Sequence, residues 1–261
     1  MKLISVFLFL VLLTKIFSFS GEGTYYAISE TVNCGLPIDM NGDLMYAALN
    51  AQQYDGAKEC GRCAKVYGPH GDNDQYKDPI TVLIVDQCPE CAYGDLDLTQ
   101  KAFEKIAPTV EGRIDITWEW VACSVTGNYK IYTDSGSNIY WTSFQIRNNR
   151  IDVTKVEIED AGTWHDASLQ EHNYWYYDPA SSISQPFKVR VTGINQEVFT
   201  TTIDTFEAGK EYDSGYQFEG GDSDGNGDND DDNGTDNTDF GKGNKTDLYY
   251  NFYVDGYRIK S

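Results

Sequence analysis

The sequence predicts an all-β protein of two domains, on the basis of three observations. Short segments in which apolar and polar residues alternate recur along the chain, as expected of strands with one buried face. Turn residues separate the later segments at a spacing typical of β-sandwiches. All six cysteines precede residue 124, at Cys34, Cys60, Cys63, Cys88, Cys91 and Cys123. The chain therefore divides into a cysteine-containing domain and a cysteine-free domain.

The first residues have the pattern of a secretory signal peptide. A basic residue is followed by an apolar run that ends on small residues at Ser18 and Ser20. We predict cleavage after Ser20, which makes residues 1–20 the signal. A membrane anchor is the alternative, but the uninterrupted apolar run, residues 3–13, is too short to span a bilayer. We expect a secreted, extracellular protein with no membrane partner after cleavage.

The composition limits the classes of partner. The formal net charge is -21 and the pI is near 4.3. An acidic surface repels phosphate backbones, so we predict no nucleic-acid partner. Phe, Trp and Tyr make up 14% of the chain, which supplies flat amphipathic rings for contact with neutral ligands.

The cysteines favour disulfides over a metal site. An even number of cysteines behind a signal peptide is typical of disulfide-bonded domains. The alternative is zinc, because Cys60-x-x-Cys63 and Cys88-x-x-Cys91 resemble a four-thiolate motif. The gap between the two pairs is longer than in zinc ribbons, and an oxidising compartment disfavours free thiolates. We expect disulfides and no metal, with all fifteen possible pairings left open.

Strands are predicted at two places in the first domain, residues 21–125. Residues 80–86 are apolar on both alternations, as in a strand buried on both faces. Residues 113–122 alternate strictly and place one set of apolar side chains on one face: Ile114, Ile116, Trp118 and Trp120.

Two brief helices are also expected, one between these two strands and one before both of them. Thr99 is a capping residue, and the helix after it ends before Pro108. A second helix is predicted within residues 42–52, where apolar residues form a stripe.

The second domain, residues 128–219, is predicted to be a β-sandwich. Its alternating segments are residues 140–148, 153–160, 187–193 and 198–204. In the first of them, Phe144 and Ile146 share one face, whereas Trp141 lies on the other face with polar residues. A solvent-facing tryptophan is costly to leave exposed, so it indicates a binding surface.

The remaining residues are predicted to form an acidic tail. Residues 220–247 are rich in Asp, Gly and Asn, and we expect disorder; residues 248–261 have no predicted structure. Asp222, Asp224 and Asn226 match half of a calcium loop, but the twelfth position is Asn233 rather than Glu, so we favour a solvated tether. Glycosylation sequons begin at Asn233 and Asn244.

Several stretches resemble the expansin family, in particular expansin-like proteins outside land plants. They are "GTYYAI", "CGRCAKVYGPHG", "ITVLIVDQCPEC", "LDLTQKAFEKIA", "IDITWEWVAC", "TGNYKIY", "YWTSFQIRNNR" and "FKVRVTG". Together they cover about residues 23–218 in order. The resemblance implies a six-stranded double-psi β-barrel followed by an immunoglobulin-like β-sandwich that binds carbohydrate.

The same resemblance implies site residues and disulfides. In the barrel, an open groove would contain Thr24, Asp86 and Asp97. In the sandwich, a polysaccharide-binding platform would contain Tyr140, Trp141 and Tyr174, where Tyr140 requires a local twist of the strand. Trp175 and Tyr176 are alternatives to Tyr174 as the exposed ring. The implied disulfides are Cys34–Cys60, Cys63–Cys123 and Cys88–Cys91.

The carboxylates decide between a binding protein and an enzyme. Inverting glycosidases need an acid and a base about 6.5–9.5 Å apart. The resemblance implies that Asp97 corresponds to the acid of such enzymes, and that Asp86 lies on the same side of the groove and not across the sugar. Against these roles, Asp97 can serve as a helix N-terminal carboxylate, Asp86 as a turn residue and Thr24 as an ordinary strand residue.

The resemblance to expansins implies loosening of a wall or matrix by disruption of noncovalent polysaccharide contacts. With the missing base, it leads us to predict a secreted, monomeric, non-hydrolytic protein that binds cellulose or a related β-glucan and acts in this way. No cofactor is expected. The alternatives are a glycan-cleaving enzyme, either a glucanase or a lytic transglycosylase with Asp97 as acid, and a structural cellulose-binding matrix protein. The histidines, His70, His165 and His172, lack metal-ligand spacing and are expected at the surface.

Overall fold

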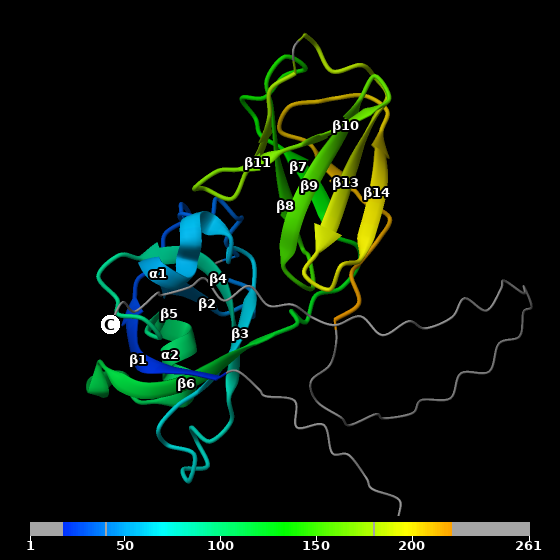
Figure 1. The fold of residues 1–261 in the computed structure, drawn as a ribbon. Helices are drawn as coiled ribbons and strands as arrows, with labels where there is room; N and C mark the ends of the chain where they lie inside the picture. The colour runs from blue at the N-terminus through cyan, green and yellow to red at the C-terminus, as the bar shows by residue number, and fades with distance from the viewer. Residues whose placement is uncertain (1–17, 40, 180, 221–261) are drawn as a thin grey trace, which may run out of the picture. The chain divides into compact units, whose positions relative to one another are not determined.

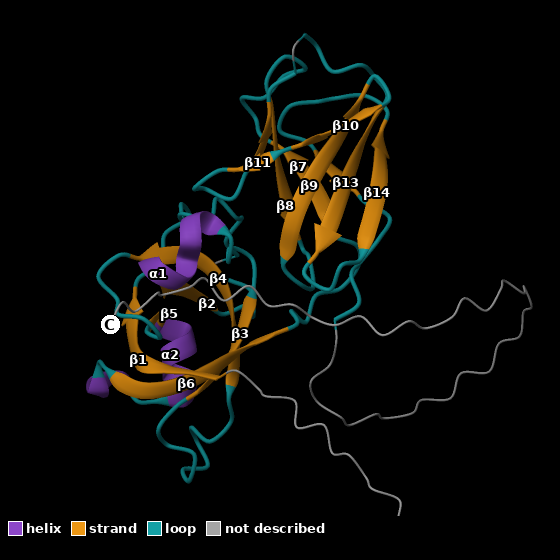
Figure 2. Ribbon diagram, viewed as in Figure 1, coloured by secondary structure: helices purple, strands orange, loops and turns teal. Residues whose placement is uncertain are grey.

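The computed structural model describes residues 18–39, 41–179 and 181–220. Strands and loops account for most of these residues, and the helices are short (Figure 2). A closed barrel comes first along the chain and a β-sandwich second (Figure 1), so the predicted all-β fold is confirmed. Across the described ranges, no helix has the length and apolar character that crossing a membrane requires.

Six strands close the barrel in the order β1-β5-β2-β4-β3-β6. Two neighbouring pairs, β1 with β5 and β2 with β4, are parallel, and the other pairs are antiparallel. The strands are β1 (Ser18–Tyr26), β2 (Tyr46–Asn50), β3 (Cys63–Tyr67), β4 (Ile80–Cys88), β5 (Leu96–Thr99) and β6 (Ile114–Val121).

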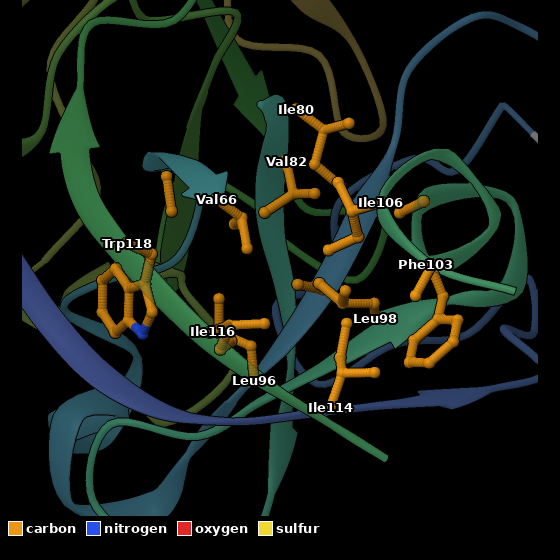
Figure 3. Close-up of a cluster of buried hydrophobic side chains, with 14 of the residues drawn as sticks. Val66, Ile80, Val82, Leu96, Leu98, Phe103, Ile106, Ile114, Ile116 and Trp118 are labelled. Atoms are coloured by element: carbon orange, nitrogen blue, oxygen red, sulfur yellow. The ribbon is translucent and has the colours of Figure 1, made fainter. Parts of the chain in front are cut away.

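The barrel interior is filled by aliphatic side chains and two large rings. Figure 3 shows Leu96, Leu98, Ile114 and Ile116 gathered with Phe103 and Trp118 at opposite sides of the cluster. Trp118 is fully buried, and its indole Nε1 donates a 2.7 Å hydrogen bond to the Gly94 carbonyl. The polar atom of this ring is thus satisfied, so its burial adds apolar contact without an unpaired donor.

Four short helical segments connect the barrel strands. They are α1 (Ala51–Tyr54), η1 (Asp55–Ala57), α2 (Gln100–Ile106) and η2 (Thr109–Glu111). The helix expected after Thr99 is confirmed as α2, but the Thr99 side chain does not cap it. Its hydroxyl instead accepts a 3.5 Å hydrogen bond from the Tyr46 backbone amide.

The helix predicted within residues 42–52 is wrong. That segment contains strand β2, which pairs with β4 on one side and β5 on the other. All five residues of β2 are buried, so their apolar side chains form no single stripe. Burial inside a closed sheet overrides the helical spacing of the apolar residues.

Strand β1 begins three residues earlier than the predicted domain boundary. Ser18, Phe19 and Ser20 pair with Glu119, Trp118 and Thr117 of β6. The Phe19 ring lies 4.3 Å from that of Trp118. Cleavage after Ser20 would therefore remove the start of a barrel strand. Residues 1–17 lie outside the described residues.

Three disulfides join the six cysteines: Cys34–Cys60, Cys63–Cys123 and Cys88–Cys91. They follow the pairing that the family resemblance implies. Because all six sulfurs are bonded, the four-thiolate zinc site is excluded.

The sandwich packs a four-stranded sheet, β10-β9-β13-β14, against a five-stranded sheet, β11-β12-β8-β7-β15. Their inner faces share one apolar core, which includes Phe144, Ile146, Val189 and Phe218. The strands are β7 (Lys130–Thr133), β8 (Thr142–Arg147), β9 (Val153–Asp160), β10 (Thr163–Asp166), β11 (Ser168–Leu169), β12 (Trp175–Tyr177), β13 (Phe187–Gly193), β14 (Val198–Ile203) and β15 (Glu211–Asp213).

Hydrogen bonds connect the barrel with the sandwich inside a single compact unit. The Gln145 side-chain amide donates to the Cys34 carbonyl at 2.9 Å, and the Tyr54 hydroxyl donates to the Glu171 carbonyl at 3.2 Å. Gln145 is fully buried, although its position on β8 places it on the face that was expected to meet solvent. The outer face of the five-stranded sheet is therefore covered at this point.

Candidate functional site

The barrel pairing brings Thr24 and Asp97 together. They lie 73 residues apart in sequence, and the parallel pairing of β1 with β5 places them opposite each other. The Thr24 hydroxyl donates a 2.6 Å hydrogen bond to Asp97 Oδ1. Two of the three predicted barrel residues are thus in direct contact.

The environment of Asp97 favours its protonated form. The carboxyl is half-buried, and burial is the main cause that raises its pKa above the usual value. The nearby carboxylates of Glu90 and Asp86 raise it further, whereas the Thr24 hydrogen bond and Arg113 oppose them. A raised pKa suits a group that donates a proton or a hydrogen bond.

Asp86, the third predicted barrel residue, is held by the backbone. Its Oδ1 accepts hydrogen bonds from the amides of Asn33, at 3.0 Å, and Gln87, at 2.9 Å. Asp86 also lies opposite Ala48 at an irregularity in the pairing of β2 with β4. The turn-residue interpretation of Asp86 therefore has direct support, alongside its electrostatic contact with Asp97.

Tyr26 is a member of this site that the sequence reasoning missed. It follows Thr24 by two residues on β1, so both side chains lie on the same face of the strand. Its hydroxyl oxygen is buried and, within the described residues, has no hydrogen-bond partner. Burial is the main cause that raises its pKa, and Asp86 and Asp97 contribute. Tyr26 could have been identified from the sequence, because it lies two residues after Thr24 and side chains two residues apart share one face of a strand.

Glu90 is the second member that was missed. It lies in the loop between β4 and β5, is exposed, and its charge contributes to the raised pKa of Asp97. Its place in "CPEC" gave no sign of this role, because the loop path was not predicted. We refer to Thr24, Tyr26, Asp86, Glu90 and Asp97 as the barrel site.

Two predicted platform residues are exposed on the sandwich. Tyr140 is 64% exposed and Trp141 is 43% exposed. Both lie in the turn before β8, which Asn138 closes by exchanging backbone hydrogen bonds with Trp141 at 2.8 and 3.1 Å. The turn frees Tyr140 from the strand alternation, which is how a residue expected to point inward reaches solvent.

The exposure expected for Tyr174 is wrong. This ring is only 9% exposed, and a Cβ added to Gly35 of the barrel would lie 3.2 Å from it. Tyr176 has the place next to Trp141, with ring centroids 5.5 Å apart. Tyr176 pairs with Ser143 on the neighbouring strand, and the Ser143 side chain lies on the same face of the sheet as Trp141. Trp175, in contrast, belongs to the core. We refer to Tyr140, Trp141 and Tyr176 as the aromatic surface.

The structure offers no metal centre within its described part, where no three His, Cys, Asp or Glu side chains are grouped for a metal ion. A hollow of about 460 Å³ is lined by residues such as Leu36, Leu44 and Met45, and none of the predicted groove or platform residues lines it. The barrel site is therefore defined by its side chains and not by this cavity. The predicted calcium loop and the sequons at Asn233 and Asn244 lie outside the described residues.

Two family profiles match the chain. Residues 46–118 match the lytic transglycolase profile, and residues 122–219 match the profile of the expansin-like protein middle domain. These ranges correspond to most of the barrel and to the sandwich.

Curated proteins and solved structures are similar over most of their lengths. Expansin-like protein 5 of Dictyostelium discoideum is 33% identical, over 76% of this chain and 84% of its own length. Expansin-YoaJ of Bacillus subtilis is 32% identical, over 77% and 90%. The crystal structure of apo Clavibacter michiganensis expansin superimposes with a TM-score of 0.70 at 26% identity, over 78% and 98%. An aspartate-to-asparagine variant of the latter was solved in complex with cellohexaose, with a TM-score of 0.69, 25% identity and the same coverage.

Proposed function

The chain belongs to the expansin family, and on this premise we propose that it is a secreted protein that binds cellulose or a related β-glucan and loosens noncovalent contacts between polysaccharide chains. The proposal includes an extracellular location and no hydrolysis. One observation carries it: Tyr140 and Trp141 of the aromatic surface are exposed, in a chain whose structural neighbour was solved with cellohexaose.

The aromatic surface supports binding to a flat, neutral chain. Trp141 and Tyr176 lie side by side, and the Tyr140 ring extends into solvent. Sugar rings stack on aromatic faces by apolar contact, and the contributions add along a chain of identical sugars. The overall charge of -21 disfavours acidic polymers, which leaves neutral glucan as the better ligand.

The barrel site supports a grip by hydrogen bonds. A protonated Asp97 can donate to a glucan hydroxyl, and the raised pKa of Asp97 favours that form. Hydrogen bonds offered to one glucan chain compete with those between neighbouring chains in a fibre. This exchange requires no energy source, so the loosening is local and reversible.

Filter-paper weakening tests the proposal. We expect the wild-type protein to bind crystalline cellulose and to weaken wet filter paper without releasing reducing ends. Trp141→Ala should lose binding, and Asp97→Asn should keep binding but lose weakening. A wild-type protein that does not bind cellulose would overturn the proposal, as would weakening that is equal in Asp97→Asn.

Glycan cleavage is the second candidate function, because the barrel matches the lytic transglycolase profile and Asp97 has the raised pKa of a general acid. Glu90 is the carboxylate to test as its partner, since Asp86 already accepts two backbone amides. Incubation with cellulose and with peptidoglycan, followed by detection of reducing ends and anhydro-sugars, decides this. Products that vanish in Asp97→Asn and Glu90→Gln would establish an enzyme.

A structural matrix protein that binds but does not loosen is the third possibility. It predicts full cellulose binding and no weakening of filter paper by the wild-type chain. The two measurements together therefore separate all three functions.

A further inference from the structure

The outer face of strands β1, β6 and β3 contains a hollow that belongs neither to the barrel site nor to the aromatic surface. Strand β6 runs between β1 and β3 and pairs with both of them (Figure 1). The hollow has a volume of about 540 Å³, and its lining is formed by residues 20–22, 67–69 and 115–117. All of these residues belong to the barrel. We refer to them as the Tyr67 hollow.

Three side chains form a row across the Tyr67 hollow. Ser20 of β1 pairs with Thr117 of β6, and Thr117 pairs with Tyr67 of β3. Their sequence neighbours Val66 and Trp118 pack in the barrel core, so the alternation of the strands points this row outward. All three residues of the row are exposed. Because paired strands lie about 4.8 Å apart, the row places one aromatic ring beside two hydroxyl-bearing side chains.

The Tyr67 ring is held in place before any ligand binds. It is 36% exposed, and its hydroxyl donates a 3.0 Å hydrogen bond to Glu119 Oε1. The Lys65 ammonium lies 5.9 Å from the centre of the ring. A ring that is already fixed loses little rotational freedom when a ligand stacks on it.

The chemistry of the Tyr67 hollow fits a neutral sugar. Glu22 and Asp115 pair across β1 and β6 next to the row, and Glu22 forms an ion pair with Arg113. Carboxylates and hydroxyls can bond the hydroxyl groups of a sugar, and the sugar face can stack on the ring. The carboxylates disfavour an anionic ligand. One exposed ring beside Pro69 is a small apolar area for a protein partner.

The Tyr67 hollow and the barrel site lie on different sides of the barrel. Asp97 is on β5 and Tyr67 is on β3, which are three strands apart in either direction around the closed ring of six. Their outer faces therefore point to opposite sides. Strand β1 is common to both, with Ser20 in the hollow, Thr24 in the barrel site and Glu22 between them. An extended, stiff glucan chain cannot follow this curvature, so one chain cannot occupy both sites.

We propose that the Tyr67 hollow is a second glycan site of the barrel, which holds a neutral β-glucan chain while the barrel site grips a neighbouring one. This rests on the proposed glucan-binding function and adds a mechanical role to it. A barrel with a chain on each of two sides keeps those chains apart. Chains that are kept apart cannot re-form the contacts between them, which is what loosening of a fibre requires.

Cellohexaose titration of the full chain, followed by amide NMR, tests the second site. We expect shifts at Ser20 and Thr117 in addition to those at Thr24. Tyr67→Ala should weaken the response at Thr117 roughly fivefold, because the stacking ring is lost, and leave the response at Thr24 unchanged. Asp97→Asn should leave the response at Thr117 unchanged, because the two sites take separate chains.

Two further variants guard against a folding defect. Thr117→Lys places a long side chain in the hollow from an exposed position, and it should give the same loss as Tyr67→Ala. Tyr216→Ala is the matched control, because this ring is 43% exposed in the second domain and should change neither response. Both hollow variants should lose the weakening of wet filter paper, although they still bind cellulose through the aromatic surface.

The outcomes separate this proposal from the function on which it rests. No shift at Ser20 and Thr117 in a protein that binds crystalline cellulose would overturn the second site alone. A Thr117 response that is unchanged in Tyr67→Ala and Thr117→Lys would do the same. A loss at Thr117 in Asp97→Asn, or full weakening activity in both hollow variants, would refute the separation of two chains. Absence of any response to cellohexaose and of binding to cellulose would remove the proposed function, and the second site with it.

Discussion

The barrel site and the aromatic surface are built in opposite ways. Thr24 and Asp97 reach each other through the pairing of strands that are 73 residues apart in sequence. Tyr140 and Trp141 are neighbours in one turn, and Tyr176 joins them from the adjacent strand β12. The first site depends on the closure of the whole barrel, whereas the second depends on a turn and one strand pair.

The two sites also differ in their chemistry. The barrel site is made of groups that titrate or donate hydrogen bonds, with the pKa of Asp97 raised by burial. The aromatic surface consists of rings, whose contact with sugars does not change with pH over the acid range. A protein with both can hold a glucan by stacking at any pH and engage it by hydrogen bonds under acidic conditions. Each prediction below separates these two contributions.

The largest expected effect is the loss of binding on changing Trp141 to Ala. Removing the contact of a large ring costs about 2 kcal/mol, or roughly a thirtyfold loss in affinity for cellulose. Depletion of the protein from solution by crystalline cellulose measures it. Trp164→Ala is the matched control, because Trp164 lies on β10 of the other sheet, stacked under Arg190 at 4.0 Å. An equal loss in both variants would show that the effect is not specific to the aromatic surface.

Changing Phe19 to Ala should weaken the barrel and spare cellulose binding by the sandwich. A buried Phe costs about 3–5 kcal/mol to truncate, and Phe19 is only partly buried, so we expect about 1.5 kcal/mol in denaturant unfolding. Tyr93→Ala is the control, since this ring is 60% exposed and meets Phe19 edge-on. Under the proposed secretion, the mature chain should retain Phe19, so N-terminal sequencing should find its first residue at or before Ser18. A mature chain that starts at Gly21 would contradict this.

The sandwich was the easier domain to predict from sequence. The alternation at residues 140–148 correctly placed Phe144 and Ile146 inside and Trp141 outside. Such alternation is a local property, so it is readable without knowing the partner strands. It did not predict that the polar neighbours on the same face are covered: Ser143 is 4% exposed and Gln145 is fully buried. Gln145 is covered by the barrel, where its side-chain amide donates to the Cys34 carbonyl. Ser143 is covered within the sandwich, where its backbone amide donates to the Ser137 hydroxyl and Tyr176 lies opposite.

The barrel was harder to predict, because its strands are defined by distant partners. Residues 46–50 have helical spacing, yet they form β2 between β4 and β5, and nothing local distinguishes the two outcomes. The contact of Thr24 with Asp97 was reached through the family resemblance. Glu90 was missed because its effect on Asp97 depends on the path of the loop, and that path is set by the disulfide and by Gly94. At Gly94, φ is +93° and a Cβ would lie 2.2 Å from the Ser20 carbonyl oxygen.

Tyr176 and Tyr174 provide a sharper test of the aromatic surface itself. Tyr176→Ala should weaken cellulose binding roughly fivefold, because one of the stacking rings is lost while the fold is retained. Tyr174→Ala should leave binding by the folded protein unchanged, since that ring is buried against Tyr132 and the barrel. Titration with cellohexaose measures both. The reverse ranking would restore Tyr174 to the surface and remove Tyr176 from it.

The smallest expected effect is a difference in how two aspartates respond to pH. The pKa of Asp97 is raised in the folded state, so its contribution to stability is present below the unfolded value of about 3.9 and is lost as the pH rises through the folded value. Asp97→Asn should therefore be more stable than the wild type at neutral pH, and the difference should vanish in acid.

Asp213 of the sandwich is the opposite case, because the amine of Lys130 lowers its pKa to about 2. Asp213→Asn should lose stability at neutral pH, and the difference should shrink as the pH falls and disappear only below pH 2, as followed by urea unfolding across the acid range. Parallel pH profiles in the two variants would mean that the electrostatic contrast between barrel and sandwich does not exist.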